Sequence, residues 1–358
     1  MMLKEFSNYL EQLEGSPAFK NYLQVRERVL FMLDEAASRN DRPSDYWKEE
    51  LAGFEYMLDA SPLIIEKLRE HCFHLTGLRS GDYRGHHSSQ AGIYRKKWEK
   101  LKAVDKNGLW VPESPQLGGF GFSVDGQLMN LDTLKFYECL IALEGAGLLS
   151  KFRVEAGPRP VVLEIGAGWG GFAYQFKALC PNTTYVIIDL PQTLLFSGTY
   201  LKTAFPQTSI FIYGDQSGAG LLKHDQGYDF ILLPNYSWNE FNSHLDLAIN
   251  MVSFQEMTTA QVEGYVNKIA GSGCPYLYSM NRDRSPYNSH ISSVSAIIAS
   301  YFETRNINPL PETYVDLPTS LVKGGAAAII EDAKTVARRW FLKEEFKYQH
   351  LLGTRRKN

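Results

Sequence analysis

A glycine-rich turn at residues 164–171 carries the residues of this sequence that are best suited to chemistry. The run VVLEIGAGWGG places an apolar strand before the turn, and a helical pattern follows it. Gly166, Gly168 and Gly170 let the backbone pass close to a ligand where any Cβ would collide. The amide-rich start of the following helix directs positive charge to the same place. The turn therefore predicts a nucleoside cofactor, bound by Gly166, Ala167, Gly168, Trp169 and Gly170.

Glu164, two positions before the first glycine, distinguishes between two classes of cofactor. The glycine spacing also satisfies the GxGxxG fingerprint of dinucleotide sites. A dinucleotide places a negative pyrophosphate beside the turn, and a neighbouring carboxylate would repel it. S-adenosylmethionine (SAM) instead presents a sulfonium and an α-amino group, which a carboxylate attracts. The residues favour SAM, and an NAD-linked oxidoreductase is the weaker alternative, because the sheet region also lacks a Tyr-x-x-x-Lys pair.

Acidic residues also end the next two predicted strands. Asp189 follows Gly166 by 189 − 166 = 23 residues, and an acid there can bind the ribose hydroxyls of either cofactor class. Asp215 would accept a hydrogen bond from the adenine amino group, or it would cap the next helix. The contacts expected at these two strand ends are Asp189, Leu190, Gly214, Asp215 and Gln216.

A general base is needed for methyl transfer to a hydroxyl, which is an in-line displacement. Candidate bases lie on loops at the carboxyl ends of strands, where ligands bind in such sheets. Burial near the site would raise the pKa of Glu256 and suit it to this role, and its alternative is a carboxylate at a helix start. His290 has the alternative of a cap or surface residue. The candidate bases are Tyr236, Glu240, Glu256 and His290, and Pro234 and Asn235 are expected beside the cofactor.

The acceptor is expected to bind against the segment that precedes the turn. The loop Gln116–Phe122 has the glycines and aromatic rings of a lid. The side chains that open the next helix would cover the methionine end of SAM or bind acceptor hydroxyls, and they are Asn130, Asp132, Thr133 and Tyr137. The alternative is that Asp132 and Thr133 cap this helix and Tyr137 packs beneath it. No metal site is predicted. The adjacent histidines at 86 and 87 point to opposite sides of an extended chain and lack a nearby acidic partner.

Composition excludes several classes of protein. The chain has 358 residues, with 37 basic and 40 acidic residues and a net charge of −3, so nucleic acid is not expected as the main partner. Its four cysteines form no CxxC pair, which argues against a zinc knuckle or a redox dithiol. Because we find neither a signal peptide nor an apolar run of membrane-spanning length, we expect a cytoplasmic protein without a membrane partner.

The elements that position these residues form an α/β arrangement. We expect a helical region over 1–110, the lid loop and a connecting helix over 111–154, the cofactor domain over 155–335 and a helical tail over 336–358. Continuous apolar strands separated by helical segments indicate a mostly parallel sheet that is covered on both faces. The predicted strands are Val161–Ile165, Tyr185–Asp189, Ser209–Tyr213, Tyr228–Leu233, Pro275–Met280, Thr313–Leu317 and Ala326–Ile330, and a helix is predicted over His290–Phe302.

These motifs resemble those of the class I SAM-dependent methyltransferase superfamily. The run from Glu164 to Gly170 is similar to its E/D-x-G-x-G-x-G signature, and Asp189 and Gly214-Asp215 follow at the expected distances. The resemblance covers about residues 155–335. It implies a Rossmann-like sheet of seven strands, mostly parallel with an antiparallel last hairpin, and SAM lying across its carboxyl edge.

A narrower resemblance is to a bacterial family described as sugar O-methyltransferases. It rests on Pro115–Tyr137, the turn at 164–171, Asp189–Pro191 and Ser253–Met257. It implies methyl transfer from SAM to a hydroxyl of a sugar or glycosylated small molecule, with S-adenosylhomocysteine as the product. N-methylation of a small molecule stays an alternative, because no residue separates an amine from a hydroxyl. The N-terminal helices would cap the site or pair two subunits in a homodimer.

Overall fold

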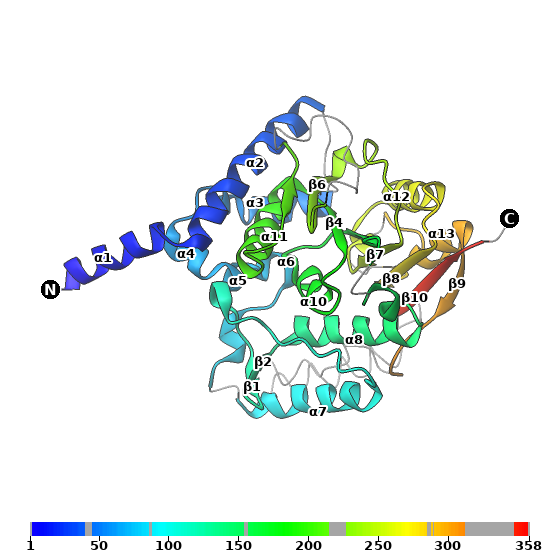
Figure 1. The fold of residues 1–358 in the computed structure, drawn as a ribbon, viewed down its shortest axis with the longest axis horizontal. Coiled ribbons are helices and arrows are strands. Elements are labelled where there is room, and N and C mark those ends of the chain that lie inside the picture. Colours follow the sequence, from blue (N-terminus) through cyan, green and yellow to red (C-terminus); the bar gives the residue numbers. More distant parts are fainter. Residues whose placement is uncertain are drawn as a thin grey trace.

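The computed structural model of the chain describes residues 2–39, 45–85, 88–153, 157–214, 227–284, 288, 290–311 and 347–356. Helices form the N-terminal part, and a large sheet with its covering helices forms the rest (Figure 1). The helices are α1 (Met2–Glu14), α2 (Pro17–Arg39), α3 (Asp45–Ala52), α4 (Pro62–Glu66), α5 (Leu68–His71), α6 (Phe73–Thr76), α7 (Ser88–Val104), α8 (Leu131–Gly145), α9 (Leu149–Phe152), α10 (Gly171–Leu179), α11 (Pro191–Ala204), α12 (Thr259–Gly271) and α13 (Val294–Tyr301).

The large sheet has eight strands in the order β5-β6-β4-β3-β7-β8-β10-β9. The first six of these are parallel, and β10 pairs antiparallel with both β8 and β9. A separate two-stranded hairpin is formed by β1 and β2. The strands are β1 (Phe122–Val124), β2 (Gln127–Met129), β3 (Val161–Ile165), β4 (Thr184–Asp189), β5 (Ile210–Ile212), β6 (Phe230–Pro234), β7 (Leu247–Met251), β8 (Tyr276–Arg282), β9 (Phe302–Asn306) and β10 (Tyr348–Arg355).

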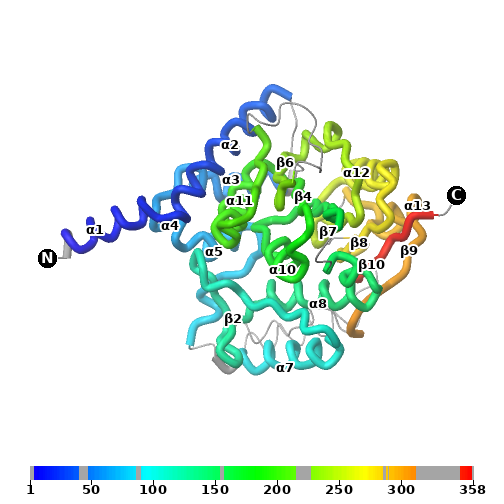
Figure 2. Tube along the Cα trace, in the orientation of Figure 1, coloured from blue at the N-terminus to red at the C-terminus, as the bar shows by residue number. Residues whose placement is uncertain are grey.

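Helices cover both faces of this sheet. The strand residues alternate between two apolar clusters, so that Val162 packs with α8, α10 and α11, and Leu163 packs with α12 and α13. The long helix α2 adds an outer layer by lying along α11 (Figure 1). The two ends of the chain lie on opposite sides of the molecule (Figure 2). In the described part of the chain, no helix is long and apolar enough to span a membrane.

The predicted fold class is confirmed: a mostly parallel α/β sheet with an antiparallel hairpin follows N-terminal helices. The described sheet has eight strands instead of seven. The predicted strand Ser209–Tyr213 forms β5 at one edge, where it pairs with β6. In the sheet, β6 lies directly beside β4, and β7 lies on the other side of β3.

Three strands of the large sheet, β7, β9 and β10, and both strands of the small hairpin were not predicted from the sequence. Leu247–Met251 forms β7, where we had expected a helix start nearby. Tyr348–Arg355 forms β10, so the predicted helical tail is wrong over these residues. The strand β10 lies between β8 and β9, and its residues Tyr348, His350, Leu351 and Leu352 are buried. A central strand of a covered sheet requires such burial, whereas a helix at the end of the chain would leave one face exposed. The strands predicted at 313–317 and 326–330 lie outside the described residues.

Candidate functional site

A cavity of about 450 Å³ lies at the carboxyl ends of the parallel strands. Its floor comes from the ends of β3, β4, β6 and β7, which meet at one edge of the sheet. Its other walls come from α3, α6 and the start of α8. The sequence-predicted residues that line it are Glu164, Gly166, Ala167, Gly168, Trp169, Asp189, Leu190, Asn235 and Glu256.

The glycine turn adopts left-handed backbone at each of its three key positions. The φ values are 73° at Gly166, 59° at Gly168 and 83° at Gly170, a region that residues with a Cβ rarely adopt. A Cβ on Gly166 would lie 2.2 Å from the hydroxyl oxygen of Ser253, so that glycine is also required by packing. A Cβ on Gly168 would meet no protein atom within 4 Å, because this part of the turn faces the cavity. Gly168 thus leaves room for a ligand.

Asp189 ties the end of β4 to this turn. Its two carboxylate oxygens accept hydrogen bonds from the Gly168 N–H at 2.9 Å and from the Leu190 N–H at 2.8 Å. Burial raises the pKa of Asp189 to about 7, and the backbone donors oppose that shift. The carboxylate is held in place by the backbone and faces the cavity.

Glu164 is the most deeply buried acid of the cavity wall. Its side chain comes from β3, the residue is 1% exposed, and its carboxylate accepts a hydrogen bond from the Tyr185 hydroxyl at 3.0 Å. Burial raises the pKa of Glu164 to about 8, while the bond from Tyr185 opposes this shift. In the described part of the chain, no salt bridge neutralises this group. A cationic ligand would therefore be stabilised strongly here.

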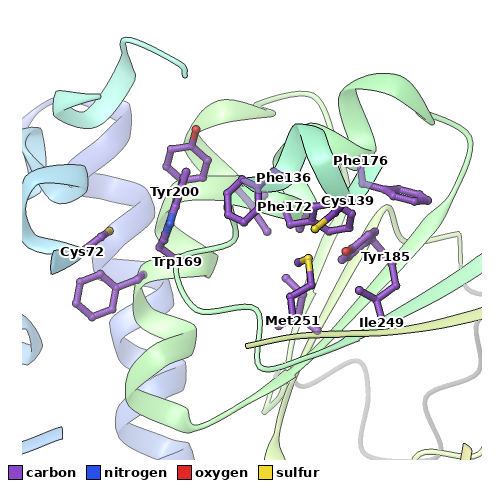
Figure 3. Close-up of a cluster of buried hydrophobic side chains, with 14 of the residues drawn as sticks. Cys72, Phe136, Cys139, Trp169, Phe172, Phe176, Tyr185, Tyr200, Ile249 and Met251 are labelled. Carbon is purple, nitrogen blue, oxygen red and sulfur yellow. The ribbon is translucent and has the colours of Figure 1, made fainter. Parts of the chain in front are cut away.

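Trp169 anchors the turn to the N-terminal helices. Its ring packs 4.8 Å from Tyr200 and 6.0 Å from Phe136, centroid to centroid (Figure 3). The fully buried guanidinium of Arg69 lies 3.5 Å from its ring centroid, and the Trp169 indole N–H donates to Asp132 at 3.1 Å. Arg69 in turn forms a 2.7 Å ion pair with Glu113. Sequence analysis missed this buried ion pair, since residues 69 and 113 belong to no recognisable motif.

The loop after β7 forms the wall beside the turn. Val252 has a φ of 64°, which is unusual for a β-branched residue, and it directs Ser253 against Gly166. Glu256 follows on the same loop and hydrogen-bonds with Trp47 of α3. Burial raises the pKa of Glu256 to about 8, and the bond with Trp47 opposes the shift.

Three of the four candidate bases lie away from the cavity. The Tyr236 hydroxyl donates to the Met32 carbonyl at 3.1 Å, against α2. Glu240 is exposed and pairs with Arg39 at 2.7 Å. His290 is exposed, and its carbonyl accepts from the Thr259 N–H at the start of α12. Of these four residues, only Glu256 lines the cavity.

Several predicted cofactor contacts also lie elsewhere. Tyr137 lies on the buried side of α8, and its hydroxyl donates a hydrogen bond to the Asp105 carboxylate at 2.7 Å. Gly214 packs against Phe31 of α2, because β5 is separated from β4 by β6. Gly170 and Pro234 support the turn and β6 without lining the cavity. Asp215 and Gln216 lie outside the described residues.

The segment before the turn has a structural role. Thr133 takes part in a capping box at the start of α8, as its alternative predicted, but the N-cap residue is Asn130 and not Asp132. The predicted lid loop does not line the cavity: Leu117, Phe120 and Phe122 are buried, and Gly119 lies against the carbonyl of Ser114. The histidines at 86 and 87 lie outside the described residues.

The N-terminal helices supply cavity residues that the sequence did not indicate. Trp47 and Glu50 come from α3, His74 comes from α6, and Lys135 comes from α8. Burial lowers the pKa of His74, and its ring nitrogen lies 3.4 Å from the Tyr56 hydroxyl. Lys135 forms a 3.0 Å ion pair with Asp132. These helices therefore cap the site, one of the two roles proposed for them.

Comparison with known proteins yields structural neighbours, and no family model or curated protein matches the chain. Phosphoethanolamine N-methyltransferase 2 of Haemonchus contortus, in complex with SAM, is 10% identical with a TM-score of 0.35, over 60% of this chain and 52% of that one. The chain thus spans about half the length of that enzyme. Cyclopropane synthase MmaA2 of Mycobacterium tuberculosis is 12% identical with a TM-score of 0.37, over 75% and 97% of the two chains.

N-methyltransferase NodS of Bradyrhizobium japonicum WM9, in complex with S-adenosylhomocysteine, is 12% identical with a TM-score of 0.33, over 74% of this chain and 99% of that one. At these identities and TM-scores the neighbours carry no argument about the site.

The buried carboxyl groups predict a pH dependence of stability. Raised pKa values of about 8 for Glu164 and Glu256 and about 7 for Asp189 mean that the folded protein holds protons which the unfolded chain has lost. The free energy of unfolding should therefore fall as pH rises from about 5 to 8, with a slope of up to about 1.4 kcal/mol per pH unit for each such group. Urea unfolding across this range measures the slope. E164Q should make the slope shallower by the share of one group and E240Q should not, and an equal slope in all three proteins would contradict the assignment.

Proposed function

We propose that the protein is a SAM-dependent methyltransferase. The observation that carries this proposal is the carboxyl group of Glu164, buried beside a left-handed glycine turn and without a salt bridge among the described residues. SAM would supply the missing positive charge through its sulfonium and α-amino group. A dinucleotide would instead bring its pyrophosphate to this carboxylate, so an NAD-linked reaction fits poorly.

The donors and acceptors around the cavity suit the rest of this cofactor. Asp189 would bind the ribose hydroxyls, and Asn235, at the end of β6 beside it, would face the adenine. Thr193 lines the cavity with a buried hydroxyl that has no hydrogen-bond partner among the described residues, so it is available to a ligand. When bound, SAM supplies an electrophilic methyl group.

Glu256 would act as the general base. It is the only predicted base that lines the cavity, and its raised pKa of about 8 makes it a stronger proton acceptor than an ordinary glutamate. Trp47 holds its carboxylate through a hydrogen bond, which fixes the direction in which the proton leaves the acceptor. We propose a hydroxyl of a sugar or glycosylated small molecule as the acceptor. N-methylation is the second candidate, since the acidic wall of Glu50 and Glu256 would also suit an amine.

Calorimetry tests the cofactor directly. SAM and S-adenosylhomocysteine should bind the wild-type protein, and NAD should not. D189N keeps the size of the side chain but loses a charge-assisted bond, so its affinity for SAM should fall at least about tenfold. E240Q, which changes an exposed acid far from the cavity, is the matched control and should bind SAM like the wild type. Tight binding of NAD alone, or an unchanged affinity in D189N, would overturn the cofactor assignment.

The pH profile of methyl transfer tests the base. Because Glu256 must lose its proton before it can accept another, the rate should rise with pH up to about 8. E256Q should lower the rate by about 10²- to 10⁴-fold and leave SAM affinity unchanged, whereas E240Q should do neither. A rate in E256Q within a few-fold of the wild type would show that another group removes the proton.

A further inference from the structure

One side of the cavity is formed by α3 and by the loop after β7. Trp47 and Glu50 are three residues apart on α3, so they lie on one face of that helix, and both line the cavity. Glu256 lies on the loop after β7 and hydrogen-bonds with Trp47. Two carboxyl groups from distant parts of the chain therefore share this end of the cavity.

Acidic side chains outnumber basic ones in the cavity lining. Four described lining residues are acidic, namely Glu50, Glu164, Asp189 and Glu256, and the one lysine or arginine among the described lining residues is Lys135. Burial raises the pKa of Glu164 and Glu256 to about 8, so these two groups hold protons in the empty cavity at neutral pH and ionise when a cation binds beside them. Lys135 is already engaged by Asp132 at 3.0 Å, and burial lowers the pKa of His74, which disfavours the charged form of its ring.

The cofactor would occupy only one end of this lining. SAM carries two positive groups and one carboxylate, so its net charge is about +1. Its cationic groups would bind against Glu164, beside the glycine turn, and leave Glu50 and Glu256 to the acceptor. Glu50 then has no salt-bridge or hydrogen-bond partner for its carboxylate within the described residues, and its charge contributes to the raised pKa of Glu256.

We infer that the acceptor is a cationic small molecule, whose ammonium group is recognised by Glu50 and Glu256, and that phosphorylated and carboxylated acceptors are excluded. This inference rests on the proposed function and narrows its acceptor to an amine-bearing sugar or glycoside. An ammonium relieves the repulsion between the two carboxylates, whereas an anion would add to it. The acidic wall thus sets specificity both by attracting one class of acceptor and by repelling another.

The transfer step is compatible with this wall. The acceptor oxygen forms a bond to the methyl carbon, and the carbon–sulfur bond breaks with its electron pair remaining on sulfur. The acceptor hydroxyl proton passes to Glu256. Glu50 takes no proton in this step and holds the neighbouring ammonium, so it is a specificity residue and not a catalytic one.

Binding of matched sugars to the S-adenosylhomocysteine complex tests the inference. Glucosamine, N-acetylglucosamine and glucose 6-phosphate differ in charge at similar size, and calorimetry at fixed ionic strength compares their affinities. Glucosamine should bind at least about tenfold more tightly than the other two, and E50Q should remove most of that preference. E49Q, which alters an exposed neighbour on α3, should retain it. Equal or tighter binding of glucose 6-phosphate would overturn the inference.

If none of these sugars binds, small ions of opposite charge test the same inference. Ethylammonium should raise the melting temperature of the S-adenosylhomocysteine complex more than acetate does at the same ionic strength, and E50Q should abolish the difference. Equal effects of the two ions on the wild type would overturn the inference. Binding of S-adenosylhomocysteine is measured first, because its loss would count against the proposed function and not against the acceptor charge.

Discussion

A carboxyl group that is buried without a cation keeps its proton, and this constraint shapes the whole cavity. Glu164 is 1% exposed and has a pKa of about 8, because the apolar strands around it exclude water. The cost of that burial is offset when a ligand brings a positive charge to the same place. The glycine turn makes this possible, since Gly168 presents bare backbone to the cavity where a side chain would fill it.

The turn is rigid because other parts of the chain hold it from both sides. Asp189 binds the Gly168 N–H from the neighbouring strand, and Ser253 fills the space beside Gly166. On the outer side, Trp169 packs on Arg69 from the N-terminal helices. A fully buried arginine requires counterions, and Glu113 and Asp132 provide them. The N-terminal region thus supports the geometry of the turn from outside the sheet.

Local patterns in the sequence predicted the residues that line the cavity at the strand ends. The Glu164–Gly171 turn, Asp189 and Asn235 lie at strand ends that continuous apolar runs define, and these runs became β3, β4 and β6. The cofactor contact predicted at Gly214 is not found at the cavity, because β5 pairs with the outer side of β6 and is thereby kept away from β4. Strand order is a tertiary property, and no residue near Gly214 indicates the position of β5 in the sheet. Tyr236 and Glu240 do not line the cavity for a related reason, since their side chains bind to α2, which lies more than 190 residues earlier in the chain.

The cavity wall that the N-terminal helices supply could not be predicted from local pattern. Trp47, Glu50 and His74 belong to short helices that are distant in sequence from the turn, and only packing brings them to the cavity. The strand Tyr348–Arg355 was missed because its hydrophobic residues are few and its partners, β8 and β9, lie at least 42 residues earlier in the chain. Glu256 was predicted from its type and apolar neighbours alone, and its link to Trp47 emerged only in three dimensions.

Proton release on SAM binding tests the central claim most directly. Calorimetric titrations at pH 7 in two buffers of different ionisation enthalpy give the number of protons released per SAM bound. With a pKa of about 8 for Glu164 in the free protein, a cation bound beside it should displace close to one proton, and E164Q should release markedly fewer. SAM binding with no proton release, or the same release in E164Q, would contradict the account.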